Sequence, residues 1–238
     1  MSTFVAIHGA WSAGWAWWRM HPLFSQAHAR LLTPTCTGVG ERSHLLGPHV
    51  DLEVHIEDMA QVLEYEDLSD IVLIAHSYGG MVGTGLADRL PGRIRQLIYV
   101  DALLPESGES ALDLLPDGQR TGILQATREK GFGWLIPPAP LPTDTPPHDR
   151  ELAARRRGPQ PLGTFTTPLD LKGRAAEIPA AYIRCMDTGP VDSFALSAAR
   201  ARQRKGWQFH ELAASHNPHI TVADAFTELI FSIAAPHA

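Results

Sequence analysis

The segment that most constrains the fold is an apolar run that ends at a serine and continues into a run of small residues. Residues 71–74 are β-branched or apolar, residues 79–83 are rich in glycine, and Ser77 lies in the short turn between them. A buried strand that passes directly into a helix is typical of parallel sheets whose two faces are covered by helices. The chain is therefore expected to contain such a sheet.

The same turn makes Ser77 a candidate nucleophile. A serine hydroxyl reacts only when a base and a site for the developing oxyanion lie close to it. A sharp turn from strand to helix exposes the serine and directs the amides of the helix N-terminus at the reacting carbonyl. The usual pattern is G-x-S-x-G, and here Ala75 replaces the first glycine. Because alanine is also small, we expect the turn to tolerate it.

Strand-like and helix-like segments alternate along the whole chain. Six strands are predicted, at residues 3–7, 29–34, 70–75, 95–100, 178–185 and 207–212. Apolar residues recur at helical spacing in residues 15–25, 52–65, 80–90 and 222–235. This alternation predicts an α/β fold of about six mostly parallel strands with helices on both faces.

One long segment interrupts the alternation. Residues 105–177 lie between the fourth and fifth strands, are too long for a simple crossover, and include the proline-rich stretch 137–142. Loops of this length without structure of their own are uncommon in a compact domain. We therefore predict that residues 105–177 form an inserted cap, and that residues 1–104 and 178–238 form the core.

The composition is that of an ordinary globular enzyme. Of the 238 residues, 44% are hydrophobic and 19% are charged, and the net charge of -6 gives no reason to expect nucleic-acid binding. The short basic run at residues 155–157 is interpreted as a solvated helix face. No apolar run has the ~20 residues that a membrane span needs, and the N-terminus does not resemble a signal peptide. A cytoplasmic location is expected, and a homodimer is possible.

The sequence shows no pattern for a metal or a cofactor. Cys36 and Cys185 are too far apart to suggest metal-ligand spacing or a disulfide framework, so both are expected to be buried thiols. The histidines are scattered and lack the H-E-x-x-H pattern of zinc enzymes. The predicted chemistry therefore uses no cofactor and no metal.

The base and the acid are predicted from their positions along the chain. In serine hydrolases of this kind the order is serine, acid, histidine. His216 is the first histidine after the last strand and is the predicted base, with His219 as the fallback. Asp187, just after the fifth strand, is the predicted acid. Asp192 and Asp101, which follows the fourth strand, are the alternatives.

Two backbone amides are predicted to form the oxyanion hole. One belongs to Tyr78, directly after the nucleophile, and the other to Ala10, in the turn after the first strand. Gly9 allows the backbone of this turn to approach Ser77 closely. His8 is expected to brace the turn rather than to take part in catalysis.

Several segments together resemble one group of the α/β hydrolases. They are residues 4–11, Trp15, residues 17–18, residues 38–45, the Ser77 turn, residues 100–102 and the His216 loop. The group contains small bacterial carboxylesterases, pyrethroid-type ester hydrolases, plant methyl-ester esterases and hydroxynitrile lyases. The resemblance spans nearly the whole chain. It implies the α/β-hydrolase fold, with six parallel strands in the spatial order two-one-three-four-five-six and a cap between the fourth and fifth.

The resemblance also favours ester hydrolysis over cyanohydrin cleavage. The lyases of this group are distinguished by a threonine beside the oxyanion-hole residue and by a lysine after the catalytic histidine. This chain has Gly9 and Asn217 at those positions. Many relatives have two or three residues between the strand end and the acid, but here only Met186 precedes Asp187. This short spacing keeps Asp101 open as the acid.

The predicted function is hydrolysis of a carboxylic ester of a hydrophobic small molecule through an acyl-enzyme. Gly9, Trp11 and Trp134 are the predicted substrate contacts, and the cap aromatics Phe132 and Phe165 either line the pocket or attach the cap to the core. A carbon–carbon bond lyase or hydrolase and a non-enzymatic ligand receptor are the alternatives, because the same fold is used for both.

Overall fold

The computed structural model describes residues 2–235, and a six-stranded parallel sheet runs through it. The strands are β1 (Thr3–Ile7), β2 (Arg30–Leu32), β3 (Ile71–His76), β4 (Ile94–Val100), β7 (Ala180–Cys185) and β8 (Gln208–Leu212). Their spatial order is β2-β1-β3-β4-β7-β8, and each neighbouring pair is parallel. This confirms the predicted fold class and strand order.

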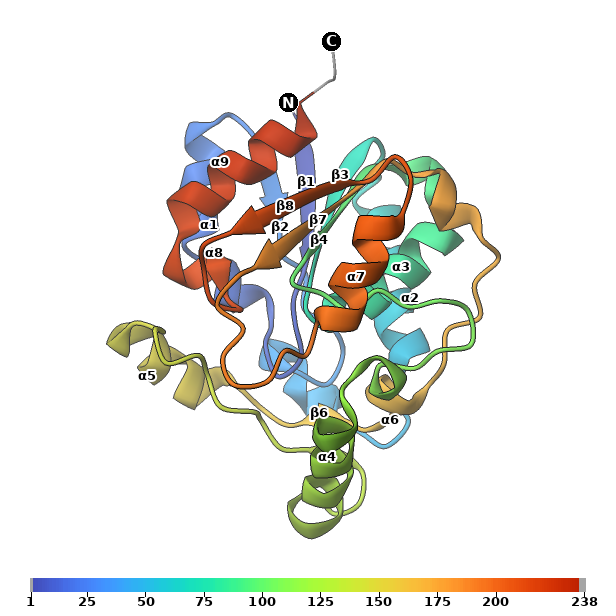
Figure 1. Cartoon of the computed structure of the whole chain (residues 1–238), viewed down its shortest axis with the longest axis vertical. Helices are drawn as coiled ribbons and strands as arrows, with labels where there is room; N and C mark the ends of the chain where they lie inside the picture. The colour runs from blue at the N-terminus through green and yellow to red at the C-terminus, as the bar shows by residue number, and fades with distance from the viewer. Residues whose placement is uncertain (1, 236–238) are drawn as a thin grey trace.

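Helices cover both faces of this sheet, as Figure 1 shows. One face carries α1 (Met20–Gln26), α8 (Pro218–Thr221) and α9 (Ala223–Ala234), and the other carries α2 (Leu52–Tyr65), α3 (Gly79–Arg89) and α7 (Ala195–Gln203). The 3-10 helices are η1 (Gly14–Trp17), η2 (Gly40–Leu45), η3 (Pro91–Arg93), η4 (Leu112–Leu114) and η5 (Arg174–Glu177). The single helix predicted at residues 15–25 is thus divided into η1 and α1, and α7 was not predicted.

The central strands are apolar on both faces, which is why they read as continuous hydrophobic runs. In β3, Ile71, Leu73 and Ala75 belong to the cluster that packs under α2 and α3, whereas Val72 and Ile74 belong to the cluster under α1 and α9. Successive side chains of a strand point to opposite faces of the sheet. Burial on both faces therefore favours an apolar residue at each of positions 71–75 of β3, and it holds Ser77 at the end of a rigid strand.

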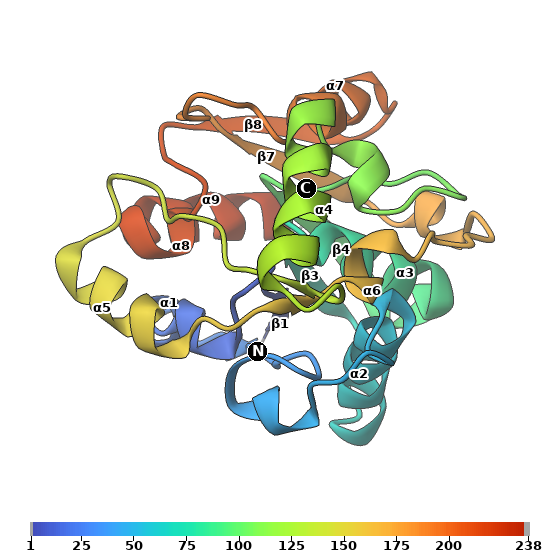
Figure 2. The same cartoon turned by 90° about the horizontal axis from the view of Figure 1, so that it is seen from below.

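The segment between β4 and β7 adds no strand to the main sheet. It contains α4 (Asp117–Lys130), α5 (Pro147–Arg156), α6 (Gly163–Thr166) and a small antiparallel pair, β5 (Leu135–Ile136) with β6 (Gln160–Pro161). Figures 1 and 2 show these elements gathered at one end of the molecule. The arrangement fits an inserted cap, although the division into core and cap residues stays a prediction.

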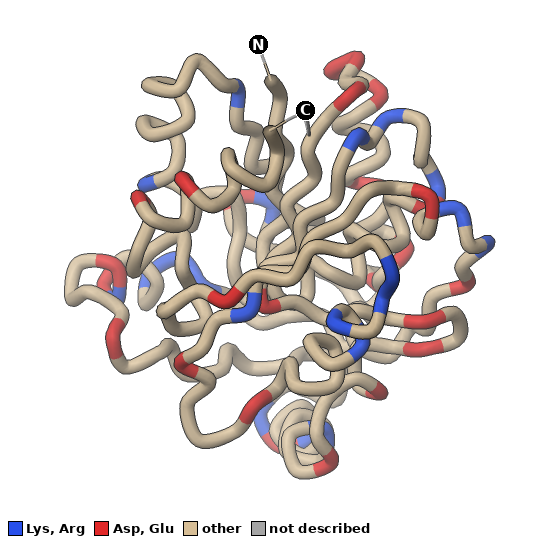
Figure 3. The backbone as a smooth tube through the Cα atoms, turned by 45° about the horizontal axis from the view of Figure 1, so that its top comes forward, with Lys and Arg blue, Asp and Glu red and all other residues tan. Residues whose placement is uncertain are grey.

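Charged residues of both signs are interspersed around the molecule, as Figure 3 shows. No helix within residues 2–235 combines the length and the apolar character that crossing a membrane requires.

A buried carboxylate joins α3 to the segment that returns from the cap. The side chain of Asp88, in the last turn of α3, accepts hydrogen bonds from the backbone N–H groups of Lys172 (2.7 Å), Arg174 (2.6 Å) and Ala175 (3.3 Å). Asp88 is buried. Hydrogen bonds to a buried charged acceptor are among the more stabilising in proteins. Asp88 therefore fixes the start of η5 against the core.

We expect Asp88→Ala to lower the free energy of unfolding by roughly 3 kcal/mol, because it leaves three backbone donors without their acceptor. Urea denaturation followed by circular dichroism measures this loss. Asp170→Ala is the matched control, since Asp170 pairs with Lys172 at the surface, where ion pairs contribute little. Equal stability of the two variants would contradict the role given to Asp88.

Candidate active site

Ser77 lies in a strained turn between β3 and α3. Its φ angle is +58°, in the left-handed region that residues other than glycine rarely adopt. Hydrogen bonds hold this backbone on the loop after β4: Ser77 N–H donates to the carbonyl of Val100 (3.2 Å), and the Ser77 carbonyl accepts from the N–H of Leu103 (3.0 Å). Strain of this kind persists only where the surrounding structure imposes it. The turn presents the Ser77 side chain at the carboxyl end of the sheet.

Glycines make this turn possible because neighbouring backbone approaches it closely. A Cβ atom at Gly79 would lie 2.8 Å from the carbonyl oxygen of Ile7, and one at Gly80 would lie 2.0 Å from that of Leu103. The structure also explains why Ala75 is accepted in place of the usual glycine. Its methyl group packs against Gly83 of α3, where an added Cβ would be only 2.9 Å away.

His216, in the loop after β8, connects Ser77 to a carboxylate. Its Nε2 atom is 3.0 Å from Ser77 Oγ, and its Nδ1 atom is 2.8 Å from Asp101 Oδ2. A carboxylate only accepts hydrogen bonds, so Nδ1 carries the proton and Nε2 is free to accept the serine proton. The ring of Phe194 stacks on the imidazole at 4.8 Å. These contacts leave the imidazole of His216 in one orientation and one tautomer.

The carboxylate beside His216 belongs to Asp101, not to Asp187, and this corrects the first choice made from the sequence. The side chain of Asp187 is exposed, and among residues 2–235 its one hydrogen bond is accepted by Oδ1 from the N–H of Gly189 at 3.3 Å. With Met186 as the only spacer, the chain after β7 continues to pair with the strand β8: Met186 N–H donates to Leu212 and Asp187 N–H to Ala214. This pairing turns the Asp187 carboxylate towards solvent and away from His216.

Asp101, the alternative acid, follows β4 directly. Its backbone has a φ of +40°, and its N–H donates to the carbonyl of Ile183 in β7 at 2.8 Å. The carboxylate is buried and also receives a hydrogen bond from Arg184 at 2.5 Å. Asp192, the other alternative, lies on the far side of that arginine at 2.5 Å and does not contact His216. The sequence analysis did not identify Arg184.

Two other histidines near the site, His76 and His219, are buried, and burial favours their neutral form. His219, the fallback base, stacks on Trp17 at 4.6 Å, and burial lowers its pKa to about 3. Burial, together with the nearby His216 and His219, holds the pKa of His76 well below its ordinary value. The Nε2–H of His76 donates to the backbone carbonyl of His216 at 2.8 Å. His76 therefore supports the loop that carries the base.

The two amides predicted for the oxyanion hole are available. Neither the N–H of Ala10 nor that of Tyr78 donates a hydrogen bond within the described residues 2–235. Gly9 brings this loop against the nucleophile, because a Cβ there would lie 2.9 Å from the Cβ of Ser77. His8 braces the loop as expected: its Nδ1–H donates to the Gly9 carbonyl at 2.8 Å, and its Nε2 accepts from the N–H of Cys36 at 3.1 Å.

Trp11 links the oxyanion loop to both short strands of the inserted segment. Its indole N–H donates to the Ile136 carbonyl of β5 at 3.1 Å, and its backbone N–H donates to Gln160 Oε1 of β6 at 3.2 Å. Its ring lies 6.0 Å from that of Phe165, which stacks on Tyr78 at 5.3 Å. Because Gln160 lies in a segment without a recognisable pattern, nothing in the sequence pointed to it.

Two other aromatic residues singled out from the sequence, Phe132 and Trp134, lie between α4 and β5 of the inserted segment. The side chain of Phe132 is 87% exposed at the end of α4. Trp134 is half-buried next to β5, and its carbonyl accepts from the N–H of Leu162 at 2.8 Å. The hydroxyl of Tyr78 faces away from the turn and is 3.1 Å from Nδ1 of the buried His55. A substrate contact by Trp134 stays a prediction.

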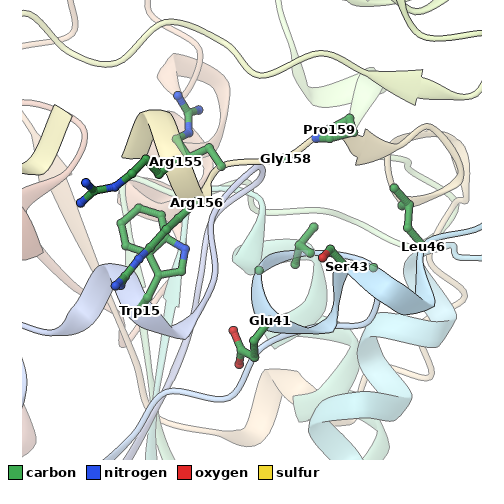
Figure 4. Close-up of a pocket in the computed structure, with 12 residues that line it drawn as sticks. Trp15, Glu41, Ser43, Leu46, Arg155, Arg156, Gly158 and Pro159 are labelled. Carbon is green, nitrogen blue, oxygen red and sulfur yellow. The ribbon is translucent and has the colours of Figure 1, made fainter. Parts of the chain in front are cut away.

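A separate cavity of about 480 Å³ lies between residues 38–46 and the end of α5, as Figure 4 shows. Trp15, Glu41 and Arg156 help to line it, whereas none of the three residues in the hydrogen-bond chain does. Arg155 and Arg156 are exposed in the last turn of α5, where cations interact favourably with the helix dipole. This agrees with a solvated helix face for Arg155 and Arg156, whereas Arg157, which follows α5, is half-buried and donates to the carbonyl of Ala139 at 2.7 Å. Among the described residues, no group of three or more His, Cys, Asp or Glu side chains is arranged to hold a metal ion.

Comparisons with known proteins match the chain over nearly its whole length. A carbendazim hydrolyzing esterase from Nocardioides sp. (strain SG-4G) is 36% identical over 98% of this chain and 100% of its own. A pyrethroid hydrolase from Sphingobium wenxiniae is 28% identical over 97% of this chain and 86% of its own. The structure of an extracellular α/β-hydrolase from a Paenibacillus species superposes with a TM-score of 0.80 at 22% identity, covering 98% of this chain and 97% of its own.

These findings confirm the resemblance seen in the sequence, and the names of the relatives agree with the prediction of an ester-hydrolysing enzyme. The model of one family, described as the alpha/beta hydrolase family, matches residues 4–229. The chain belongs to the alpha/beta hydrolase family.

Proposed function

We propose that the protein is a serine esterase that hydrolyses carboxylic esters of hydrophobic small molecules, with Ser77 as nucleophile, His216 as base and Asp101 as acid. The observation that carries this proposal is the continuous chain of hydrogen bonds from Asp101 Oδ2 to His216 (2.8 Å) and from His216 to Ser77 Oγ (3.0 Å). It begins at a buried carboxylate and ends at a serine held in a strained turn, which is the arrangement that activates a hydroxyl.

In the first half-reaction, Ser77 Oγ attacks the ester carbonyl while His216 Nε2 accepts its proton. Asp101 stabilises the imidazolium that forms and keeps Nδ1 protonated. The amides of Ala10 and Tyr78 donate to the oxyanion of the tetrahedral intermediate. When this intermediate collapses, His216 protonates the leaving alcohol and the acyl group remains on Ser77.

In the second half-reaction, the same groups act on water. His216 removes a proton from a water molecule, whose oxygen attacks the acyl carbonyl. The oxyanion again receives hydrogen bonds from the two amides. Collapse of this second intermediate releases the carboxylic acid and returns the proton from His216 to Ser77. The cycle consumes one water for each ester, and it needs no group beyond the residues of the chain.

Aromatic side chains beside this site support an apolar substrate. Phe194 stacks on His216, and Trp11 and Phe165 connect the oxyanion loop to the inserted segment. Aromatic surfaces favour flat or apolar ligands by burying area and by stacking. The relatives named for carbendazim and pyrethroid hydrolysis support a small organic molecule as the substrate. We propose Gly9, Trp11 and Trp134 as its contacts.

We expect a fluorophosphonate probe to label Ser77 covalently and to abolish turnover of p-nitrophenyl esters, because the probe captures an activated serine. Mass spectrometry of the labelled peptide locates the modification. Ser77→Ala provides the control and should lose both labelling and turnover. Labelling that survives this substitution, or wild-type protein that neither labels nor hydrolyses any ester, would refute the proposal and favour a receptor or a lyase.

The choice of acid is tested by comparing Asp101→Asn with Asp187→Asn. We expect Asp101→Asn to lower kcat by ~10³–10⁴-fold, because an amide stabilises neither the imidazolium nor the required tautomer. Asp187→Asn should retain kcat within a factor of about two, since an exposed carboxylate that does not touch the base has no part in the reaction. Steady-state kinetics at one pH measure both, and thermal unfolding checks that each variant is folded. The reverse pattern would restore Asp187 as the acid.

The oxyanion hole is tested by Gly9→Ala. The added methyl group must displace the loop, because it would lie 2.9 Å from the Cβ of Ser77 and 3.0 Å from His76 Nδ1. We expect kcat to fall by roughly 10²–10³-fold, the usual effect of losing one oxyanion donor, with KM changed much less. Gly92→Ala is the matched control, since nothing lies within 4 Å of a Cβ at that position. Unchanged kcat in Gly9→Ala would argue against the Ala10 amide.

A further inference from the structure

The acid beside His216 has an unusual partner, the buried guanidinium of Arg184. Arg184 projects from β7, and its side chain is 7% exposed. One nitrogen lies 2.5 Å from Asp101 Oδ1 and another 2.5 Å from Asp192 Oδ1. Burial acts against the charged form, but the two carboxylates outweigh it and raise the pKa of Arg184. A buried cation of this kind is stable only while its partners stay in place.

The first effect of Arg184 is on the orientation of the Asp101 carboxylate. The two carboxylate oxygens of Asp101 are divided between two donors: Oδ2 accepts from His216 and Oδ1 accepts from Arg184. This division prevents the carboxylate from rotating and so keeps Oδ2 on His216 Nδ1. The backbone N–H of Asp101 donates to the carbonyl of Ile183. A side chain from β7 thus holds in place an acid that follows β4.

Arg184 also changes the charge that His216 experiences. Its positive charge opposes the effect of Asp101 on the imidazolium, and Asp192 in turn opposes the effect of Arg184. Asp192 is held in this position by a second contact, since its Oδ1 also accepts from the N–H of Phe194 at 3.0 Å. Phe194 is the residue whose ring stacks on His216. The carboxylate of Asp192 therefore connects the buried cation to the loop that covers the base.

The other titratable groups near His216 are either uncharged at neutral pH or screened by water. His76, at the end of β3, and His219, in α8, stay uncharged because burial lowers the pKa of each. Asp144 and Asp187 line an open cavity beside Ser215, where water screens their charges. Within residues 2–235, the charged side chains joined to His216 by a chain of hydrogen bonds and ion pairs are thus those of Asp101, Arg184 and Asp192.

We propose that Arg184 and Asp192 are positioning residues that hold Asp101 against His216 and set the pH range in which His216 acts as the base. Neither residue touches the reacting atoms, so neither is a catalytic residue. The inference rests on the proposed function of Ser77, His216 and Asp101. It gives the end of β7 and the loop that follows it, which supply Arg184 and Asp192, the role of adjusting an acid that follows β4.

The direction of the effect follows from the signs of the charges. Removing the negative charge of Asp192 leaves Arg184 less opposed, which disfavours the imidazolium. The acidic limb of the kcat/KM profile is then expected to move to lower pH. Removing the positive charge of Arg184 has the opposite effect and moves the limb to higher pH. Because Arg184 is buried whereas Asp192 is 37% exposed, the shift is expected to be roughly one pH unit for Arg184→Met and smaller for Asp192→Asn, whose charge water partly screens.

The decisive variant is Asp192→Asn, because its amide oxygen can still accept from Arg184 and from the N–H of Phe194. Asp192 is 37% exposed, so the variant should fold. We expect its acidic limb to lie at a lower pH than that of the wild type, and the limb of Asp187→Asn, a charge-matched control on the same loop, to stay in place. Arg184→Met should move the limb upward, and the double variant Arg184→Met/Asp192→Asn should return it towards the wild-type position.

The profile is measured with p-nitrophenyl esters and, independently, as the rate of fluorophosphonate labelling of Ser77 at each pH. An acidic limb that stays in place in Asp192→Asn, or that moves equally in Asp187→Asn, would overturn this inference. Wild-type protein that is neither labelled nor active at any pH would instead refute the proposed function, so the two failures are distinguishable. The outcome of Asp192→Asn decides the inference even if Arg184→Met does not fold.

Discussion

The structure depends on the close approach of three backbone segments around Ser77. The end of β1, the turn from β3 into α3, and the loop after β4 meet there, and glycine is required where they touch. The carbonyl of Leu103 would lie 2.0 Å from a Cβ at Gly80, and Ser77 itself has a φ of +58°. Such a conformation costs free energy, which the buried apolar strands on both sides offset. The position of the half-buried Ser77 hydroxyl is thus a consequence of how tightly the sheet and α3 pack.

This packing also explains why Asp101, the proposed acid, can come from the end of β4. The strands β4 and β7 are neighbours in the sheet, and both end at the same edge as β3. A carboxylate after either strand starts within reach of a histidine in the loop after β8. In this chain β7 carries Arg184 at the point where it faces Asp101, and the short connection after Cys185 pairs with residues 212–214. The strand β7, after which the acid was expected, instead supplies Arg184, the cation that pairs with Asp101.

The parts of the site that follow from local sequence were predictable. The strand before Ser77 and the glycines after it specify the turn in a few consecutive residues, and His216 follows from its place after the last strand. Asp187 was preferred because the acid was expected after the fifth strand. Asp101 also follows a strand, and strand ends alone do not show which way a side chain turns. That direction depends on a contact between residues 83 positions apart, the pair of Asp101 and Arg184.

The contacts of the inserted segment could not be predicted from the sequence. Proline-rich residues indicated where it departs from the α/β pattern, yet its two short strands have only two residues each, too few to show a period. Those strands hold Trp11 through the carbonyl of Ile136 and the side chain of Gln160. Trp11 has a φ of +58° and directly follows Ala10.

The position of one proposed oxyanion donor therefore depends on the inserted segment as well as on the core. A displacement of β5 or β6 would act on the backbone of Trp11 and, through it, on the Ala10 amide. Changes in this segment are then expected to alter the rate of the chemical step and not only the fit of the substrate. The proposed base and acid are less sensitive to such changes, because His216, Asp101 and Arg184 are held by strands and loops of the main sheet.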